Sequence, residues 1–376
     1  MKIAVVRECK PHENRVALTP DVVKSLIKAG FQCSIEAGAA SGIHDSLYEK
    51  AGAVIVADKA ALLSDADILL KVNSPEVAEV QHLKEGAATL SFLYAYTNPE
   101  LVKALIAKKI SAFAMDAVPR ISRAQKMDAL SSQANLAGYK AVILGADALN
   151  KIFPLMMTAA GTITPARVLI FGAGVAGLQA VATAKRLGAV VEVTDVRPET
   201  KEQVESLGGR FLEVDAAGVQ TEGGYAKEVS PEYLQKQKEL ISKHIADADI
   251  VITTALVIGK KAPVLVNEEM VKSMKPGSVI VDMAVESGGN CTLSEFNKTV
   301  VKHGVIIIGE SNLPSLVSMN ASELYAKNIS TLLLHLAGKE EFKWDMEEDI
   351  TKGCLITHRG ELIHPFTREI LNKLKS

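Results

Sequence analysis

Residues 168–197 constrain the fold of this chain more than any other stretch, because their pattern predicts a strand, a glycine turn, a helix and a second strand. Gly172, Gly174 and Gly177 form a G-x-G-x-x-G pattern directly after four apolar residues, and the helical pattern ends at Gly188. In such a turn the first glycine permits a tight bend, the second lets a pyrophosphate approach the backbone, and the third allows close packing. The helix N-terminus directs unpaired N–H groups at the phosphates. The segment therefore predicts a dinucleotide-binding turn.

An acidic residue after the second predicted strand indicates which dinucleotide is bound. Asp195 lies 18 residues beyond Gly177, where a carboxylate accepts hydrogen bonds from ribose hydroxyls and repels a 2′-phosphate. NAD(H) is thus favoured over NADP(H), although Arg197 keeps NADP(H) as an alternative. Glycine turns also occur for packing alone, so the prediction depends on the strand before the turn and the acid after it. The residues assigned to the cofactor are Gly172, Ala173, Gly174, Val175, Gly177, Asp195, Val196 and Arg197.

Charge and cysteine content exclude several classes of protein. The 376 residues carry a formal net charge of −2 with a pI near 6.5, which provides no basic field for nucleic acid. The 4 cysteines lie far apart without a C-x-x-C pair and the 8 histidines show no ligand spacing, so we expect reduced thiols and no metal. No uninterrupted apolar run reaches about 18 residues, so no membrane-spanning helix is expected.

Short apolar runs alternate with helical patterns on both sides of the glycine turn, which predicts an α/β fold with mostly parallel sheets. We expect two Rossmann-like, doubly wound domains with a cleft between them. The first domain is expected to be discontinuous, with residues 1–130 completed by the tail 320–376, and residues 131–319 form the dinucleotide-binding domain. Residues 119–130 interrupt the alternation and predict a loop before a long helix at 131–151.

Residues 2–20 (KIAVVRECKPHENRVALTP), residues 68–75 (ILLKVNSP) and the GAGVAG turn resemble the family of alanine dehydrogenases and NAD(P) transhydrogenase alpha subunits. The resemblance covers most of the chain. In the alanine dehydrogenases an arginine and a lysine at the positions of Arg15 and Lys71 hold the substrate carboxylate and carbonyl.

Two other positions depart from the alanine dehydrogenase pattern. Tyr94 stands where those enzymes have a histidine, and Glu286 where they have an aspartate. Interconverting an amino acid and a keto acid requires an acid–base group that titrates near neutrality, which a tyrosine with a pKa of about 10 does not easily supply. Glu286 could in principle supply one. Arg15 and Lys71 are then expected to be structural and to pair with local carboxylates.

Residues 119–139 (PRISRAQKMDALSSQANLAGY) resemble the loop and helix that mark the transhydrogenase alpha subunit, and residues 223–228 and 253–256 resemble its cofactor site. The resemblance implies that the nicotinamide end is lined by Arg120, Ile121, Ser122, Gln125, Lys126, Met127, Asp128 and Ser131. It implies that the rest of NAD(H) is held by Asp195, Val196, Arg197, Gly224, Gln237 and Leu256.

The resemblance implies an NAD(H)-binding peripheral subunit of a proton-translocating NAD(P) transhydrogenase, in which NADH passes hydride directly to NADP⁺ held on a partner domain. Hydride transfer between two nicotinamides changes no O–H or N–H bond at the reacting carbon, so it requires close approach in a shielded site and no general base. Tyr225 lies in a long polar loop whose composition is typical of a lid. The residues assigned to catalysis are Arg120, Gln125, Asp128, Ser131 and Tyr225.

The implied partners are a second copy of this chain, the NADP(H)-binding domain, and membrane subunits that form a proton channel. They would place a cytoplasmic chain peripherally on the inner face of the membrane. Two alternatives stay open: an alanine-dehydrogenase-like amino-acid dehydrogenase, which Arg15 and Lys71 favour, and a non-catalytic NAD-binding regulator.

Overall fold

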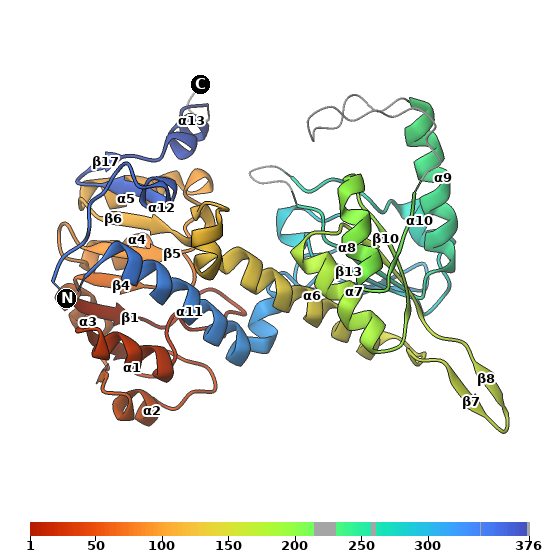
Figure 1. Cartoon of the computed structure of the whole chain (residues 1–376), viewed down its shortest axis with the longest axis horizontal. Coiled ribbons are helices and arrows are strands. Elements are labelled where there is room, and N and C mark those ends of the chain that lie inside the picture. Colours follow the sequence, from red (N-terminus) through yellow and green to blue (C-terminus); the bar gives the residue numbers. More distant parts are fainter. Residues whose placement is uncertain (214–230, 257–260, 339, 374–376) are drawn as a thin grey trace. The chain divides into compact units, whose positions relative to one another are not determined.

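The chain folds into two compact units, which are Met1–Gln133 with Pro314–Ser376, and Ala134–Leu313. The computed structural model describes residues 1–213, 231–256, 261–338 and 340–373, and for residues 231–238 it describes the backbone alone. The chain leaves the first unit and later returns to it (Figure 1). The predicted α/β class with a discontinuous first domain is confirmed. The cleft expected between the two units stays a prediction.

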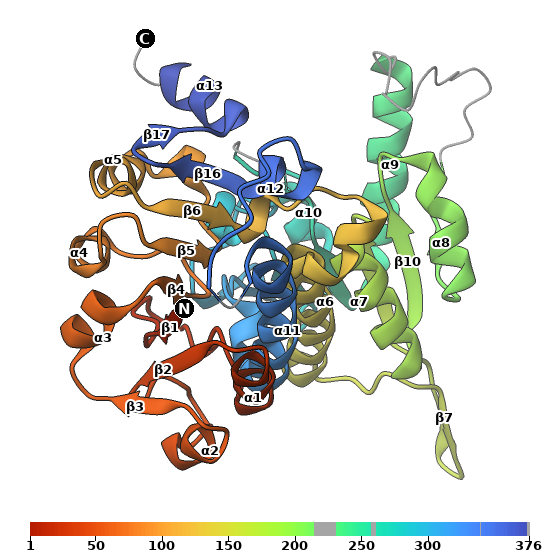
Figure 2. The ribbon, with the colours of Figure 1, turned by 60° about the vertical axis from the view of Figure 1, so that its left-hand side comes forward.

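The first unit is built on a sheet of eight strands in the order β17-β16-β6-β5-β4-β1-β2-β3 (Figure 2). Strands β1 to β6 are parallel and follow the doubly wound order 3-2-1-4-5-6, and β16 and β17 extend the sheet in antiparallel orientation. The strands are β1 (Lys2–Val5), β2 (Gln32–Glu36), β3 (Val54–Val56), β4 (Ile68–Leu70), β5 (Ala88–Ser91), β6 (Ser111–Ala114), β16 (Leu355–His358) and β17 (Glu361–Leu362).

The second unit repeats this order in a seven-stranded sheet, β11-β10-β9-β12-β13-β15-β14, in which β14 alone is antiparallel. Its central strands are buried along their whole length, as expected for a parallel sheet with both faces covered. The strands are β9 (Arg167–Phe171), β10 (Val190–Thr194), β11 (Arg210–Phe211), β12 (Ile250–Thr253), β13 (Val279–Asp282), β14 (Thr299–Lys302) and β15 (Val305–Ile308).

Helices connect the strands within each unit, and local sequence determines several of their ends. Asn98 caps one helix by accepting the Leu101 N–H at 3.2 Å, with Pro99 at the first helical position, as the sequence predicts. The helices of the first unit are α1 (Pro20–Lys28), α2 (Asp45–Lys50), α3 (Lys59–Asp65), α4 (Val77–His82), α5 (Pro99–Ala107), α11 (Ser318–Leu336), α12 (Asp349–Cys354) and α13 (Pro365–Lys373). Those of the second are α7 (Val175–Arg186), α8 (Lys201–Ser206), α9 (Pro231–Asp247) and α10 (Glu268–Ser273).

Helix α6 (Ala129–Ala148) begins in the first unit and continues into the second. It starts two residues before the predicted residue 131 and ends three residues before the predicted 151, and the predicted loop contains a 3₁₀ helix, η3 (Ser122–Met127). The 3₁₀ helix forms because Ala124 and Met127 pack into the core of the first unit. The charged residues around them in the sequence hide this apolar pattern. Shorter 3₁₀ turns are η1 (Ala95–Thr97), η2 (Met115–Ala117), η4 (Pro198–Thr200), η5 (Val285–Ser287) and η6 (Leu313–Val317).

Aromatic packing fastens the returning tail to the first unit. Phe342 stacks on Phe113 of β6 with ring centroids 5.7 Å apart, and Trp344 stacks on Phe342 at 5.1 Å. Trp344 also covers the ring of His358 at 4.3 Å. Since the contact between Phe113 and Phe342 joins segments more than two hundred residues apart, the tail completes the first unit's core. Among the described helices, none combines the length and apolar composition that crossing a bilayer requires.

Candidate functional site

The glycine turn lies between β9 and α7, and two of its glycines are required by the protein's own packing. Gly172 has a φ of +100°, and a Cβ there would lie 2.4 Å from Thr254 Oγ1. A Cβ on Gly177 would lie 1.8 Å from the carbonyl oxygen of Gly172. A side chain is thus excluded at Gly172 by its positive φ and by Thr254, and at Gly177 because the first helical turn is seated directly on the preceding loop.

Gly174 is different, because no contact among the described residues explains the absence of a side chain. Its φ of −78° and ψ of −171° are open to any residue, and a Cβ there would meet no atom of the described residues within 4 Å. The space lies at the N-terminus of α7, where the first N–H groups of a helix have no intrahelical acceptor. A Cβ would therefore fill the place where a pyrophosphate approaches these groups, so the geometry fits a bound dinucleotide.

Asp195 directly follows β10 and is held close to the turn. Its carboxylate accepts the N–H of Ala173 at 2.6 Å and the N–H of Arg197 at 2.8 Å, and the Arg197 guanidinium pairs with it at 3.0 Å. Burial alone would raise the pKa of Asp195, but the bonds from Arg197 and Ala173 lower it below its usual value. The carboxylate is thus an ionised acceptor beside the turn, and Arg197 occupies part of it.

Exposed apolar side chains surround this carboxyl edge of the sheet. Val175 in the turn is 40% exposed, Val196 after β10 is 81% exposed, and Leu256 after β12 is 60% exposed. Because β10 and β12 are the two neighbours of β9, all three follow adjacent strands at one edge. Exposed apolar groups gathered beside polar acceptors are typical of a ligand site, and a flat adenine ring suits such a surface.

A buried polar network, which the sequence reasoning missed, sets the position of Leu256. Asp282 at the end of β13 accepts the N–H groups of Asn290 at 3.1 Å and Cys291 at 2.9 Å. The Asn290 side chain accepts the Ala255 N–H at 3.1 Å and donates to the Ala255 carbonyl at 2.9 Å. An aspartate directly after the apolar strand residues 279–281 was the available signal.

The segment assigned to the nicotinamide end lies in the first unit, in and beside η3. Asp128 caps α6 by accepting the Ser131 N–H at 2.9 Å and the Ser131 hydroxyl at 2.6 Å. The structure thus brings Asp128 and Ser131 together, and it buries Met127 in the core of the first unit. Arg120, Ser122, Gln125 and Lys126 are exposed, and Ile121, Asp128 and Ser131 are half-buried. Gly224, Tyr225 and the Gln237 side chain lie outside the described residues.

Comparison with known proteins agrees with this arrangement. Residues 4–137 match the family model of the alanine dehydrogenase/PNT N-terminal domain, and residues 141–365 match that of the C-terminal domain. The chain belongs to the alanine dehydrogenase/PNT family. It is 53% identical to the first part of the NAD(P) transhydrogenase subunit alpha of Rhodospirillum rubrum, over 97% of this chain and 98% of that protein. The crystal structure of transhydrogenase from Sinorhizobium meliloti superposes with a TM-score of 0.88 at 45% identity, covering 96% of this chain and 100% of that one.

The family also includes alanine dehydrogenases, to which the likeness is lower. The Bacillus subtilis alanine dehydrogenase is 31% identical over 97% of this chain and 93% of that protein. The fold is therefore common to both branches of the family, and the choice between their activities depends on the residues of the site.

Arg15 and Lys71, the positions that hold substrate in alanine dehydrogenases, are both buried and both paired with local carboxylates. The Arg15 guanidinium binds Glu13 through two hydrogen bonds of 2.8 and 2.7 Å. The Lys71 ammonium lies 2.8 Å from Glu79 and 3.9 Å from Glu8. These pairings agree with the structural role expected for the two cations.

Tyr94 follows β5 in a left-handed conformation, with φ 42° and ψ 45°. The carboxylate of Asp116 stabilises this bend by accepting the N–H groups of Leu93 at 2.7 Å and Tyr94 at 3.2 Å. Burial raises the pKa of Asp116. Glu286 is exposed in η5 of the other unit. The position of the dehydrogenase histidine is therefore held by a tyrosine in a strained turn.

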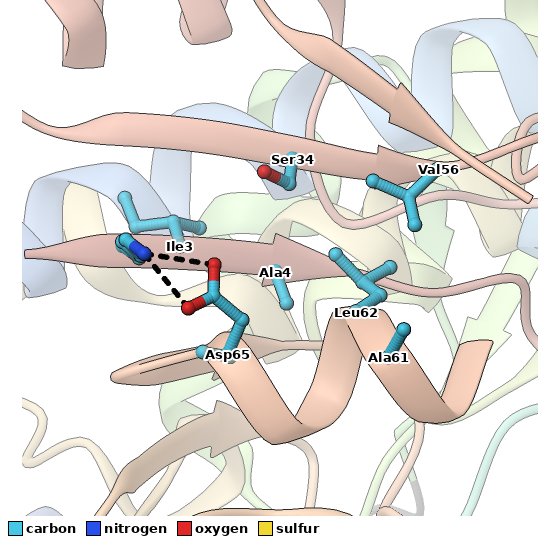
Figure 3. A pocket seen from close by; sticks show the side chains of 9 residues that line it. Ile3, Ala4, Ser34, Val56, Ala61, Leu62 and Asp65 are labelled. Atoms are coloured by element: carbon cyan, nitrogen blue, oxygen red, sulfur yellow. Dashed lines mark hydrogen bonds and ion pairs between the residues drawn. The ribbon is translucent and has the colours of Figure 1, made fainter. Parts of the chain in front are cut away.

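A small cavity of about 170 Å³ lies elsewhere, between α3 and the strands β1 to β3 of the first unit (Figure 3). Lys2 and Asp65 both line it, and the Lys2 ammonium donates to the Asp65 carboxylate at 2.7 Å. Leu62 and Val56 form much of its apolar wall. It includes none of the residues assigned to the site.

Gly174→Ala is expected to leave folding intact and to weaken NADH binding at least about tenfold, because the new methyl group occupies the pyrophosphate space. Gly177→Ala is the matched control: its methyl group meets the Gly172 carbonyl, so the variant is expected to lose thermal stability. Calorimetric titration with NADH and thermal unfolding measure the two effects. Wild-type NADH affinity in Gly174→Ala would contradict the assignment of the glycine turn to the pyrophosphate.

Glu13→Gln is expected to lower the free energy of unfolding by about 3 kcal/mol near neutral pH, because it leaves Arg15 buried without its anion. Burial alone would raise the pKa of Glu13, but Arg15 lowers it from 4.5 to about 2. Since the folded pKa is the lower one, the stabilisation is complete above pH 4.5 and is lost as the pH falls towards about 2.

Urea unfolding at a series of pH values checks this expectation. The difference between wild type and Glu13→Gln should shrink below pH 4.5. Glu323→Gln, which removes an exposed carboxylate from α11, should change stability little at any pH. A difference that stays constant through the acid range would contradict the assignment.

Proposed function

We propose that this chain is the NAD(H)-binding peripheral subunit of a proton-translocating NAD(P) transhydrogenase. The observation that carries the proposal is the open space at Gly174, which the packing of the described residues leaves unexplained and a dinucleotide explains. The transhydrogenase names of its most similar relatives support the choice of activity within the family. The pairing of Arg15 and Lys71 with carboxylates supports it further.

NAD(H) binds in this proposal as a substrate, with its pyrophosphate at the N-terminus of α7. Asp195 accepts the ribose hydroxyls, while Arg197 turns from the carboxylate towards the adenine, whose faces meet Val196 and Leu256. A carboxylate at this place repels a 2′-phosphate, so NADP(H) is held by the partner. Gly224, Tyr225 and the Gln237 side chain, which the family resemblance assigns to the same site, lie outside the described residues.

The nicotinamide end is proposed to meet the segment 120–131 of the first unit. The Gln125 side chain is exposed and makes no hydrogen bond with the described part of the chain, so its amide can bind the nicotinamide carboxamide. Asp128 holds Ser131 beside it. Arg120 orients the bound ring or meets the partner.

The chemistry then consists of one hydride that leaves C4 of NADH with its electron pair and bonds to C4 of NADP⁺, which yields NAD⁺ and NADPH. No proton is taken up at the reacting carbons, so Tyr94 in place of a histidine is compatible with the reaction. Membrane subunits of the same complex couple this step to proton passage and hold the chain at the inner, cytoplasmic face.

The deciding experiment mixes the purified chain with NADH and an NADP⁺ analogue, with and without the NADP(H)-binding component, and separately with pyruvate and ammonium. We expect transfer only with the component present. Gln125→Asn is expected to lower the transfer rate about tenfold and NADH affinity much less, because it withdraws the amide from the nicotinamide. Pyruvate-dependent oxidation of NADH by the chain alone would establish the dehydrogenase instead. NADH binding without turnover in any mixture would establish the regulator.

We also propose that two copies of the chain associate through the hairpin of β7 (Met156–Thr158) and β8 (Gly161–Ile163). All six strand residues are exposed, with Met157 77% and Ile163 43% exposed. A two-stranded hairpin is marginally stable in water unless it packs against something else. The hairpin extends away from the sheet of its own unit (Figure 1), so a second copy is a suitable partner.

The double variant Met157→Asp, Ile163→Asp is expected to shift the dimer to monomer, because it buries two carboxylates in an apolar contact. Sedimentation velocity at micromolar concentration measures the change. Val301→Asp on the edge strand β14, where the side chain is 66% exposed, is the matched control and should leave the dimer intact. A wild-type chain that sediments as a monomer would contradict this proposal.

A further inference from the structure

The 3₁₀ helix η3 carries Gln125, and side-chain contacts hold this helix on the core of the first unit. Ala124 and Met127 pack into the core of the first unit, while Gln125 and Lys126 between them are exposed. A 3₁₀ turn has poorer hydrogen-bond geometry than an α-helix, so a segment of this length depends on outside contacts for one conformation. Two such contacts come from the returning segment of the chain.

The first contact is Asn328 of α11, which is 8% exposed. Its Nδ2 donates to the Lys126 carbonyl at 2.9 Å, and its Oδ1 accepts the Ser132 hydroxyl at 2.7 Å. One amide thus joins the end of η3 to the first turn of α6, on either side of Asp128. Its neighbours along the buried face of α11, Tyr325 and Leu332, belong to the core.

On the buried face of α11, an asparagine contributes little more to stability than an apolar residue would. Burying its amide costs free energy, and its hydrogen bonds mainly offset that cost. What it adds is direction, since each hydrogen bond fixes both a distance and an angle. Asn328 therefore selects one orientation of η3 where an apolar side chain would permit several.

The second contact reaches η3 from its outer side. The Arg123 guanidinium donates to Asp349 at 2.9 Å and lies 2.9 Å from Glu348. Glu348 caps α12 through the Thr351 N–H at 2.8 Å and meets His335 of α11 at 3.1 Å. Burial alone would raise the pKa of Glu348, but these donors lower it to about 2, so it stays an anion for Arg123.

We propose that Asn328, supported by the Arg123–Glu348 pair, is a positioning residue for hydride transfer: it acts through η3 to set the direction of the Gln125 amide. Its catalytic consequence rests on the proposed function, whereas its hold on η3 does not. The C-terminal part of the chain, remote in sequence from the nicotinamide segment, thereby takes part in the reaction without touching the nucleotide.

The principal variant is Asn328→Leu, which keeps the volume of the side chain and removes both hydrogen bonds; Asn328→Ala serves where the leucine variant fails to fold. We expect amide hydrogen exchange across residues 122–128 to rise at least about tenfold, with exchange in β9 and α7 unchanged. With the NADP(H)-binding component, kcat should fall about tenfold or more and the Kd for NADH should stay within about twofold.

Lys327→Gln is the matched control, because it breaks only the exposed pair with Glu323 on the same helix. It should change neither exchange nor transfer. A double-mutant cycle joins Asn328→Leu with Gln125→Asn: if Asn328 acts through Gln125, the double variant transfers hydride no more slowly than the slower single variant. Arg123→Lys should retain more activity than Arg123→Gln, because it keeps a cation beside Glu348.

The outcomes separate the inference from the proposed function. Unchanged exchange in η3 of the Asn328 variants would overturn the inference whatever the activity. Additive losses in the cycle, or NADH affinity that falls in step with kcat, would also overturn it. A wild-type chain that transfers no hydride with its component would refute the proposed function, and the exchange experiment would still decide whether Asn328 holds η3.

Discussion

The seating of α7 on the turn after β9 is the contact on which the dinucleotide site depends. A Cβ at Gly177 would lie 1.8 Å from the Gly172 carbonyl, so helix and turn approach as closely as two backbones can. This approach places the free N–H groups of the helix at the carboxyl edge of the sheet, between the strands that carry Asp195 and Leu256.

The two units share one strand order, but the residues that follow the first strand differ between them. In the second unit the space beside Gly174 is left open, as in ligand-binding sheets of this topology. In the first unit Glu8 follows β1, and its carboxylate accepts the Val72 N–H at 2.6 Å and lies near Lys71. Burial raises the pKa of Glu8, opposed by the charge of Lys71. The first unit thus has a buried carboxylate, bonded within the unit, after its first strand.

Several elements were predictable because their signals are local. The strands β9 and β10 and the cap at Asn98 follow from apolar runs, glycines and capping residues that lie within a few positions of one another. Residues of η3 were predicted as a loop, because only the tertiary contacts of Ala124 and Met127 give that charged segment a defined conformation. The Asp282–Asn290 network and the bonds of Asn328 join residues through space, so their partners could not be read from spacing.

The sequence by itself determined the α/β class and the likeness to one family, and it predicted the dinucleotide turn and a preference of Asp195 for an unphosphorylated ribose. These depend on short-range periodicity and on residue chemistry, which a linear pattern retains. Only the tertiary structure decided that Gly174 is the glycine that packing does not require, that carboxylates already bind Arg15 and Lys71, and that the returning helix holds η3. Those facts depend on distances between residues far apart along the chain, which exist only once the chain has folded.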